Sequence, residues 1–155
     1  MTIRREPVVL FADDSADDRE LIQYVFQGQA PGLELRFTGD GVRALEALLA
    51  DATASPSSLP DVVFLDIRML TGLEVLERLR ADPRLAHLVV FVLSSSTEVR
   101  DIERAYRAGC AAYVYKSTSF DEYEDTLRRA CAFGLRLAQQ PAQDQGAGPS
   151  GSSAG

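Results

Sequence analysis

Acidic, hydroxyl and basic side chains stand immediately after several short apolar runs of this chain. Asp13 and Asp14 follow the end of VVLFA, Asp66 follows VVFL, Ser94 follows LVVFVL and Lys116 follows AYVY. Crowded carboxylates are stable only where positive charge compensates them. A crevice that holds three carboxylates, a hydroxyl and an ammonium group therefore predicts a divalent cation and a transferring phosphoryl group.

Hard carboxylate oxygens without a nearby His or Cys ligand favour Mg²⁺, which keeps water and accepts phosphate oxygens. In this prediction Lys116 supplies fixed positive charge and Ser94 supplies a hydroxyl donor. Asp66 is expected at the end of the middle strand, so it is the best candidate nucleophile and would form an aspartyl phosphate. The predicted catalytic residues are thus Asp66, Lys116 and Ser94.

Each of these residues also has a purely structural interpretation. Asp13 and Asp14 could be acids that interact with the positive end of the next helix dipole. Asp66 could cap a helix, and Lys116 could be an ordinary surface lysine. Their joint occurrence at successive strand ends favours the functional interpretation.

Short apolar runs alternate along the chain with longer amphipathic segments. Strands are expected at 8–12, 33–38, 62–65, 88–93 and 112–115, and helices at 15–27, 42–50, 73–80, 97–108 and 120–137. Ser15 and Ser119 are each followed three residues later by an acid, as at helix N-termini. The alternation predicts an α/β fold, a (βα)₅ doubly wound parallel sheet whose ligands bind beyond the carboxyl ends of the strands.

Composition narrows the class of protein. The chain has 155 residues and a formal charge of −7, which disfavours nucleic acid and anionic membranes as partners. It has no signal-peptide pattern and no apolar run near the roughly 20 residues of a membrane helix, so a cytoplasmic location is expected. Residues 1–138 are expected to form one domain and 139–155 a disordered tail.

The cysteines and the one histidine are expected to be structural. Cys110 and Cys131 have no metal-ligand spacing and are predicted to be small buried apolar residues. His87 precedes the fourth strand and is expected in a surface loop at the opposite edge of the sheet from the site.

Taken together, these motifs resemble the receiver domain of bacterial two-component response regulators. The matching segments are FADDS, VVFLDIR, VFVLSSS and AAYVYKS, within a similarity that covers about residues 8–137. The resemblance implies the flavodoxin-like receiver fold and phosphoryl transfer from a sensor histidine kinase to Asp66. It implies that Asp14 binds Mg²⁺ directly, Asp13 binds it through water, and Asp66 and the main-chain oxygen of Arg68 complete the ligands. It also implies that Ser94 and Tyr113 are the switch residues.

The chain departs from the receiver pattern at two places. The segment DIRMLTG reaches Gly72 six residues after Asp66 and lacks the usual Pro, which leaves the shape of the site mouth and the rate of dephosphorylation open. Arg68 could screen the phosphoryl group from water or point outward. Ser117 stands where most receivers have Pro, so the preceding peptide bond is expected to be trans.

A narrower resemblance concerns the partner. The KS ending and the segment DPRLAHLVVFVLSSS look like those of single-domain regulators that partner phytochrome-type histidine kinases, including bacteriophytochromes. Because the chain has no Gly-rich nucleotide motif, the phosphoryl donor is expected to be another protein.

Output is expected to pass through the receiver surface. The predicted face comprises residues 97–108, 112–115 and 120–137, and a homodimer through it is favoured by apolar residues of the last helix: Cys131, Phe133, Gly134 and Leu137. The chain is then a phosphoacceptor with at most autophosphotransfer and autodephosphorylation activity.

Two other functions stay open at this point. One is an interaction module with a vestigial site. The other is a phosphatase with an aspartyl nucleophile, of the haloacid-dehalogenase type. Such enzymes need a general acid two residues after the nucleophile, where this chain has Arg68, which cannot act as one.

Overall fold

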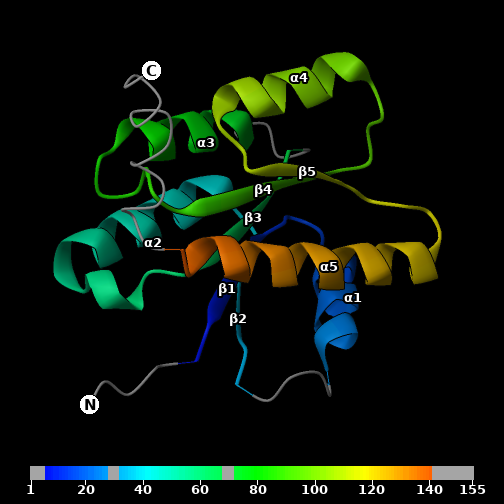
Figure 1. The fold of residues 1–155 in the computed structure, drawn as a ribbon, viewed down its shortest axis with the longest axis horizontal. Helices are drawn as coiled ribbons and strands as arrows, with labels where there is room; N and C mark the ends of the chain where they lie inside the picture. The colour runs from blue at the N-terminus through cyan, green and yellow to red at the C-terminus, as the bar shows by residue number, and fades with distance from the viewer. Residues whose placement is uncertain (1–5, 28–31, 68–71, 141–155) are drawn as a thin grey trace, which may run out of the picture.

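Five parallel strands and five α-helices alternate in the computed structural model, which describes residues 6–27, 32–67 and 72–140 (Figure 1). The strands are β1 (Val8–Ala12), β2 (Glu34–Thr38), β3 (Val62–Asp66), β4 (Val89–Ser94) and β5 (Ala112–Tyr115). The helices are α1 (Ala16–Phe26), α2 (Gly41–Ala54), α3 (Gly72–Ala81), α4 (Val99–Ala108) and α5 (Phe120–Ala138), with a 3₁₀ turn, η1 (Pro56–Ser58), after α2.

The strand order is β2-β1-β3-β4-β5. This order confirms the predicted doubly wound parallel sheet of the flavodoxin-like type. It also places β3 in the middle, so Asp66 ends the central strand. In an open sheet of this kind the strand order reverses beside β1 and β3, and that is where ligands bind.

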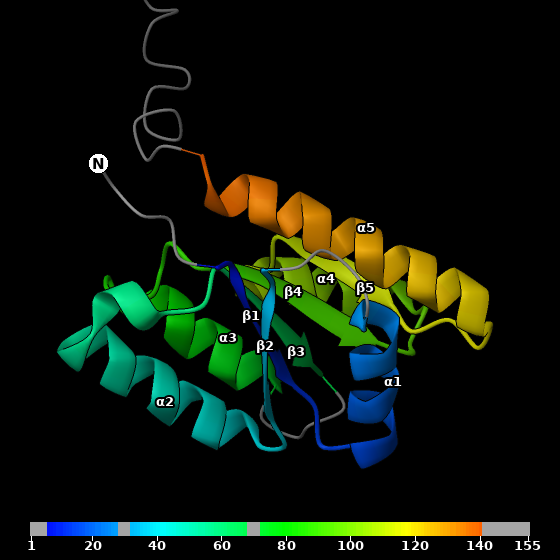
Figure 2. The same ribbon diagram turned by 90° about the horizontal axis from the view of Figure 1, so that it is seen from below.

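The sheet is covered on both faces. Helices α1 and α5 lie on one face and α2, α3 and α4 on the other (Figures 1 and 2). Successive strand residues therefore alternate between two buried layers: Phe11, Phe64 and Phe91 pack toward α1 and α5, whereas Val63 and Val90 pack toward the other helices. Burial on both faces explains why the strands read as continuous apolar runs.

Helix α2 is longer than predicted. The expected helix at 42–50 extends to Ala54 and is followed by the 3₁₀ turn η1. Asp40 starts α2 by accepting a hydrogen bond from the amide of Val42 (2.8 Å), and Ala52 in the last turn is buried. The helix therefore continues as long as its inner face can pack, beyond the point where polar residues begin in the sequence.

Helix α5 lies very close to the sheet at Gly134. A Cβ atom on Gly134 would approach Phe91 and Val62 to 3.0 Å. Of the four residues expected to give this helix surplus apolar surface, Cys131 and Gly134 are buried and Leu137 is partly buried. Phe133 alone among them is exposed, at 44%. The surplus face expected on α5 was therefore overestimated.

The cysteines are buried and unpaired, as predicted. Burial raises the pKa of the Cys110 thiol to about 11 and that of the Cys131 thiol to about 11. Among the described helices, none combines the length and the apolar character needed to cross a membrane.

Candidate functional site

The carboxyl ends of the strands bring the site together through backbone hydrogen bonds that continue past the strands. The amide of Asp13 donates to Thr38 O (2.9 Å), and that of Lys116 donates to Ser94 O (2.7 Å). Because these bonds extend the parallel ladder by one residue, the polar residues that follow the apolar runs lie at one edge of the sheet.

Lys116 is the centre of this edge. Its Nζ donates to Asp66 Oδ2 (2.8 Å), Asp18 Oδ2 (2.8 Å) and Asp13 Oδ2 (3.0 Å). Asp13 and Asp66 are fully buried and Lys116 is 8% exposed. Three carboxylates thus share one ammonium group in a site that is open to water mainly at Asp18.

The charges of the site perturb one another. Burial lowers the pKa of Lys116, but the hydrogen bonds that it donates to Asp18 and Asp66 and the nearby carboxylate charges raise it by more, so the net shift is upward. Burial raises the pKa of Asp13, against the opposing hydrogen bond from the Ser15 amide and the charge of Lys116. The site therefore keeps its ammonium group charged, while burial makes negative charge on Asp13 costly.

The sequence did not single out Asp18 as part of this site. Its spacing from Ser15 indicates a helix cap, and Ser15 Oγ indeed accepts a hydrogen bond from the Asp18 amide (3.2 Å). The Asp18 carboxylate, however, binds Lys116, and the amide of Ser15 donates to Asp13 Oδ1 instead (2.8 Å). The signal that could have indicated Asp18 is helical periodicity. Asp18 lies in the first turn of α1, and one helical turn brings a side chain back toward the edge of the sheet where the helix begins.

The predicted metal ligands are found in different surroundings. Asp13 and Asp66 belong to the buried group, whereas Asp14 is exposed and has no ion-pair partner in the described part of the chain. Arg68 lies outside the described residues. The roles of Asp14 and Arg68 as ligands stay predictions.

The predicted switch residues are joined through one residue. Ser94 is buried, and its Oγ accepts a hydrogen bond from the amide of Ser96 (3.0 Å). Tyr113, which is partly buried, donates its hydroxyl proton to Ser96 O (2.8 Å). Ser96 Oγ in turn donates to Asp101 Oδ2 on α4 (2.6 Å). A hydrogen-bonded chain therefore runs from the site to β5 and α4.

The donor set suits a divalent metal ion. Carboxylate oxygens of Asp13, Asp18 and Asp66 all lie within 4.8 Å of one another. One lysine does not balance three carboxylates, and hard oxygen ligands are those that Mg²⁺ prefers. On α5, Tyr123 is 4% exposed and its hydroxyl has no hydrogen-bond partner among the described residues, although the charges of all four groups act on it. The carboxylates and the Tyr123 hydroxyl therefore need more positive charge and more hydrogen-bond partners than the described residues of the protein provide.

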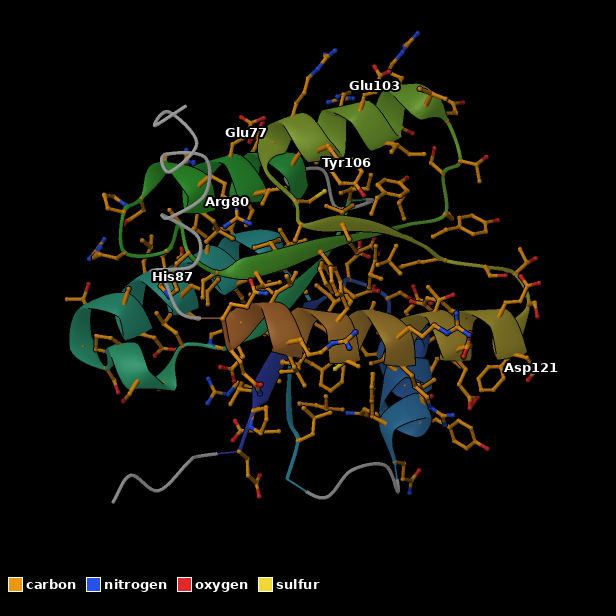
Figure 3. The ribbon with its side chains drawn as sticks, in the orientation of Figure 1. Glu77, Arg80, His87, Glu103, Tyr106 and Asp121 are labelled. Atoms are coloured by element: carbon orange, nitrogen blue, oxygen red, sulfur yellow. The ribbon has the colours of Figure 1, made fainter. Side chains whose placement is uncertain are left out.

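Two further predictions concern residues around the site. The peptide bond between Lys116 and Ser117 is trans, as predicted. His87 precedes β4 and lies beside Asp61 and Ala138, at the amino-terminal edge of the sheet. In Figure 3 it lies at the opposite end of the molecule from Asp121, at the start of α5.

Known response regulators share this fold and are 26–31% identical to this chain. The response regulator Rcp1 of Synechocystis sp. is 27% identical over 137 residues, which cover 87% of this chain and 93% of Rcp1. The response regulator RPA3017, in red light signaling of R. palustris, is 31% identical, with a TM-score of 0.75 over 87% of this chain and 98% of that chain. The phosphorylated cyanobacterial phytochrome response regulator RcpA is 26% identical, with a TM-score of 0.77 over 89% of this chain and 99% of that chain.

A structure of Rcp1 contains Mn²⁺, which shows that a similar protein binds a divalent metal; it is 27% identical, with a TM-score of 0.73 over 87% of this chain and 99% of that chain. The family described as the response regulator receiver domain matches residues 9–128. With the strand order and the lysine-centred carboxylates already described, this match establishes that the chain belongs to the response regulator receiver domain family.

Proposed function

We propose that this chain is a response regulator whose Asp66 accepts a phosphoryl group from a sensor histidine kinase in a Mg²⁺-dependent reaction. The observation that carries the proposal is the buried 2.8 Å contact between Asp66 Oδ2 and Lys116 Nζ, at the end of the central strand. The chain is then a phosphoacceptor with at most autophosphotransfer and autodephosphorylation activity, and a cytoplasmic location is part of the proposal.

The proposed transfer exchanges a P–N bond for a P–O bond. A carboxylate oxygen of Asp66 attacks the phosphorus of a phosphohistidine, the P–N bond breaks, and the imidazole nitrogen keeps the electron pair and takes up a proton. Lys116, already bound to Asp66, is positioned to neutralise an equatorial oxygen of the incoming group. Mg²⁺, when bound by the carboxylates, supplies the remaining positive charge.

The proposed response begins at Ser94. Its Oγ accepts a hydrogen bond from Ser96, so its own proton is available to donate to a phosphoryl oxygen. Movement of Ser94 would act on Ser96 and thereby on Tyr113 Oη and Asp101, which bind it. The α4–β5–α5 face is thus the proposed output surface, where it changes conformation or forms a homodimer.

A phytochrome-type histidine kinase, such as a bacteriophytochrome, is the proposed donor. The support is similarity: RcpA is a phytochrome response regulator and RPA3017 takes part in red light signaling. Ser117 replaces the proline that most receivers have after the lysine, while Lys116 itself is kept. This KS ending is consistent with the single-domain regulators that partner phytochrome-type kinases.

Phosphotransfer to the purified chain tests the proposal. The protein is incubated with Mg²⁺ and either acetyl phosphate or a panel of autophosphorylated histidine kinases that includes phytochrome-type ones. We expect a mass increase of one HPO₃, lost on adding EDTA before the donor and abolished in Asp66→Asn. Asp17→Asn, an exposed acid on α1, removes the same charge and should be labelled normally.

Three results would contradict parts of this proposal. Label that persists in Asp66→Asn excludes Asp66 as the acceptor. No labelling by any donor would favour an interaction module with a vestigial site. If light scattering gives the phosphorylated protein the mass of a monomer, the output is a conformational change without dimerisation.

A further inference from the structure

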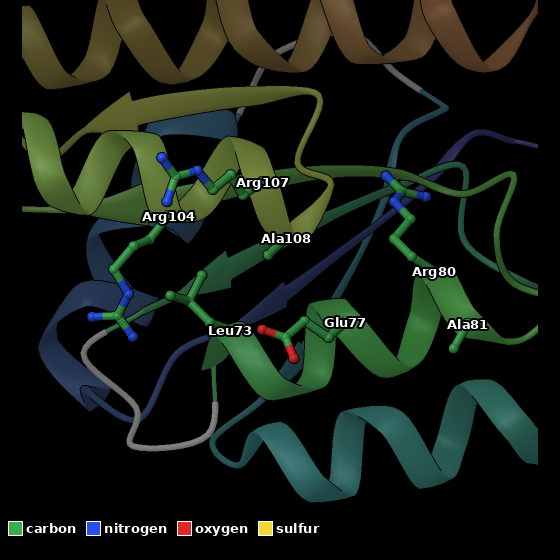
Figure 4. Close-up of a pocket in the computed structure, with 7 residues that line it drawn as sticks. All are labelled: Leu73, Glu77, Arg80, Ala81, Arg104, Arg107 and Ala108. Atoms are coloured by element: carbon green, nitrogen blue, oxygen red, sulfur yellow. The ribbon is translucent and has the colours of Figure 1, made fainter.

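A cavity between α3 and α4 carries positive charge on an otherwise acidic protein. It has a volume of about 540 Å³ and is lined by three arginines, Arg80, Arg104 and Arg107, and one acid, Glu77 (Figure 4). Its remaining lining residues are aliphatic, Leu73 among them. We refer to this cavity as the α3–α4 groove.

The groove is held open at one end by Arg80. The Nε of this residue donates to Gly109 O at the end of α4 (2.8 Å), and its Nη1 donates to Ala86 O (2.8 Å) and Leu88 O (2.6 Å) before β4. Gly109 has a φ of +107°, and a Cβ on it would approach Arg80 Cγ to 2.7 Å. Arg80 thus fixes the distance between the two helices, so the groove is built into the fold.

Within the described ranges, Arg104 and Arg107 of α4 share only one long ion pair, that of Arg107 with Glu103. Arg104 is exposed and has no ion-pair partner in the part of the chain that the structure describes. Arg107 pairs with Glu103 at 3.8 Å, with 79% of the Arg107 side chain exposed, and such exposed pairs contribute little. In Figure 4 the Arg104 side chain extends from α4 toward the level of Leu73, whereas that of Arg107 extends across α4 in the opposite direction. Two guanidinium groups are therefore available to an anionic partner.

We propose that the α3–α4 groove binds an acidic segment of a partner protein. Guanidinium groups form paired hydrogen bonds with carboxylates, and residues 104 and 107 lie one turn apart, which matches carboxylates one turn apart on a facing helix. The aliphatic floor at Leu73 and Ala108 suits an apolar side chain beside those carboxylates. Among the described residues that line the groove, none is aromatic and could stack on a base, and the net charge of −7 disfavours nucleic acid.

A fluorescein-labelled helical peptide with glutamates one turn apart and leucines between them is the probe. Its binding to the unphosphorylated protein, in EDTA, is measured by fluorescence polarisation and mapped by amide chemical shifts. We expect shifts in α3 and α4. We also expect about tenfold weaker binding by the double variant Arg104→Glu and Arg107→Glu. The matched control is Arg129→Glu with Arg136→Glu, two exposed arginines of α5, which should stay within about twofold of wild type.

The outcomes separate this proposal from its alternatives. Equal losses in the two double variants would show attraction by overall charge and overturn a specific groove site. Shifts confined to other elements would do the same. If ATP displaces the peptide and causes chemical-shift changes in the groove, the ligand of the groove is a nucleotide and not an acidic segment. Because neither donor nor Mg²⁺ is present, these results stand whether or not Asp66 accepts phosphate.

Discussion

Lys116 binds more negative charge than it can balance. Its ammonium group contacts carboxylates from β3, from the segment after β1 and from α1, at 2.8–3.0 Å. Asp18 is the member that differs in kind, because its side chain is 26% exposed while those of Asp13 and Asp66 are fully buried. It is therefore the carboxylate that can leave the lysine for a cation at the mouth of the site with the least change in burial.

Replacing Asp18 with Asn should weaken Mg²⁺ binding about tenfold. Even at the dielectric constant of bulk water, a divalent ion and a carboxylate about 5 Å apart attract each other by roughly 1.7 kcal/mol, and the partly buried site is less screened. Isothermal titration calorimetry with MgCl₂ measures the change in Kd.

The matched control for this variant is Asp17→Asn, which removes an exposed acid from the same turn of α1. Its Mg²⁺ affinity should differ from that of wild type by less than about twofold. Equal weakening by both variants would mean that Asp18 acts through overall charge and is not part of the metal site.

At this scale the sequence predicted the residues that follow strands and missed the one that lies on a helix. Asp13, Asp66, Ser94 and Lys116 could be located because the carboxyl ends of parallel strands share one edge. Asp18 could not be located, because the Ser15 amide and Lys116 are alternative donors to its carboxylate. Which of the two it binds depends on how α1 packs. The exposure of Asp14 depends in the same way on the turn between β1 and α1.

Among the elements, α5 packs unusually close to the sheet because Gly134 has no side chain. Gly134 lets α5 approach Val62 and Phe91, both of which are fully buried and enclosed by other core residues. Element types were predictable from periodicity throughout, and the strands were placed within about one residue. Helix α2 was predicted too short, because its length depends on burial of Ala52 rather than on the polarity of its last residues.

Gly134→Ala should destabilise the protein by up to about 2 kcal/mol. Alanine gains up to about 1 kcal/mol in helix propensity, but overpacking against a rigid core costs about 1–3 kcal/mol, and the three contacts at 3.0–3.1 Å leave the neighbours little room to move. Urea unfolding followed by circular dichroism gives the free energy of unfolding.

The exposed neighbour Ala132 provides the comparison. Ala132→Gly removes the propensity contribution alone and should cost about 1 kcal/mol. A more stable Gly134→Ala protein would show that α5 can shift outward from the sheet, and the close packing of this helix would then not be rigid.

Across the whole molecule, the sheet separates two apolar layers that each contain one cysteine. Cys110 belongs to the layer under α2, α3 and α4, and Cys131 to the layer under α1 and α5. Burial raises the pKa of each thiol from 9.0 to about 11. Both layers therefore resist the formation of a thiolate as long as the protein stays folded.

The free energy of unfolding should accordingly fall as the pH rises from about 9 to about 11. In this range the unfolded chain loses thiol protons that the folded chain still holds, so the unfolded state gains stability, by up to about 2–3 kcal/mol per thiol. Urea unfolding at pH 8 and pH 10.5 measures the fall, and it should be smaller in the double variant Cys110→Ala with Cys131→Ala. Equal falls in both proteins would assign the effect to other groups.

The space between positions 80 and 109 has room for only one side chain, which is that of Arg80. Arg80 Cγ lies 2.7 Å from the place where position 109 would carry a Cβ, while Arg80 Nε depends on the carbonyl of that same residue. A residue other than glycine at position 109 would be strained at a φ of +107° and would also clash with Arg80. In related sequences arginine at position 80 should therefore occur only together with glycine at position 109, whereas the glycine should persist where the arginine has been replaced.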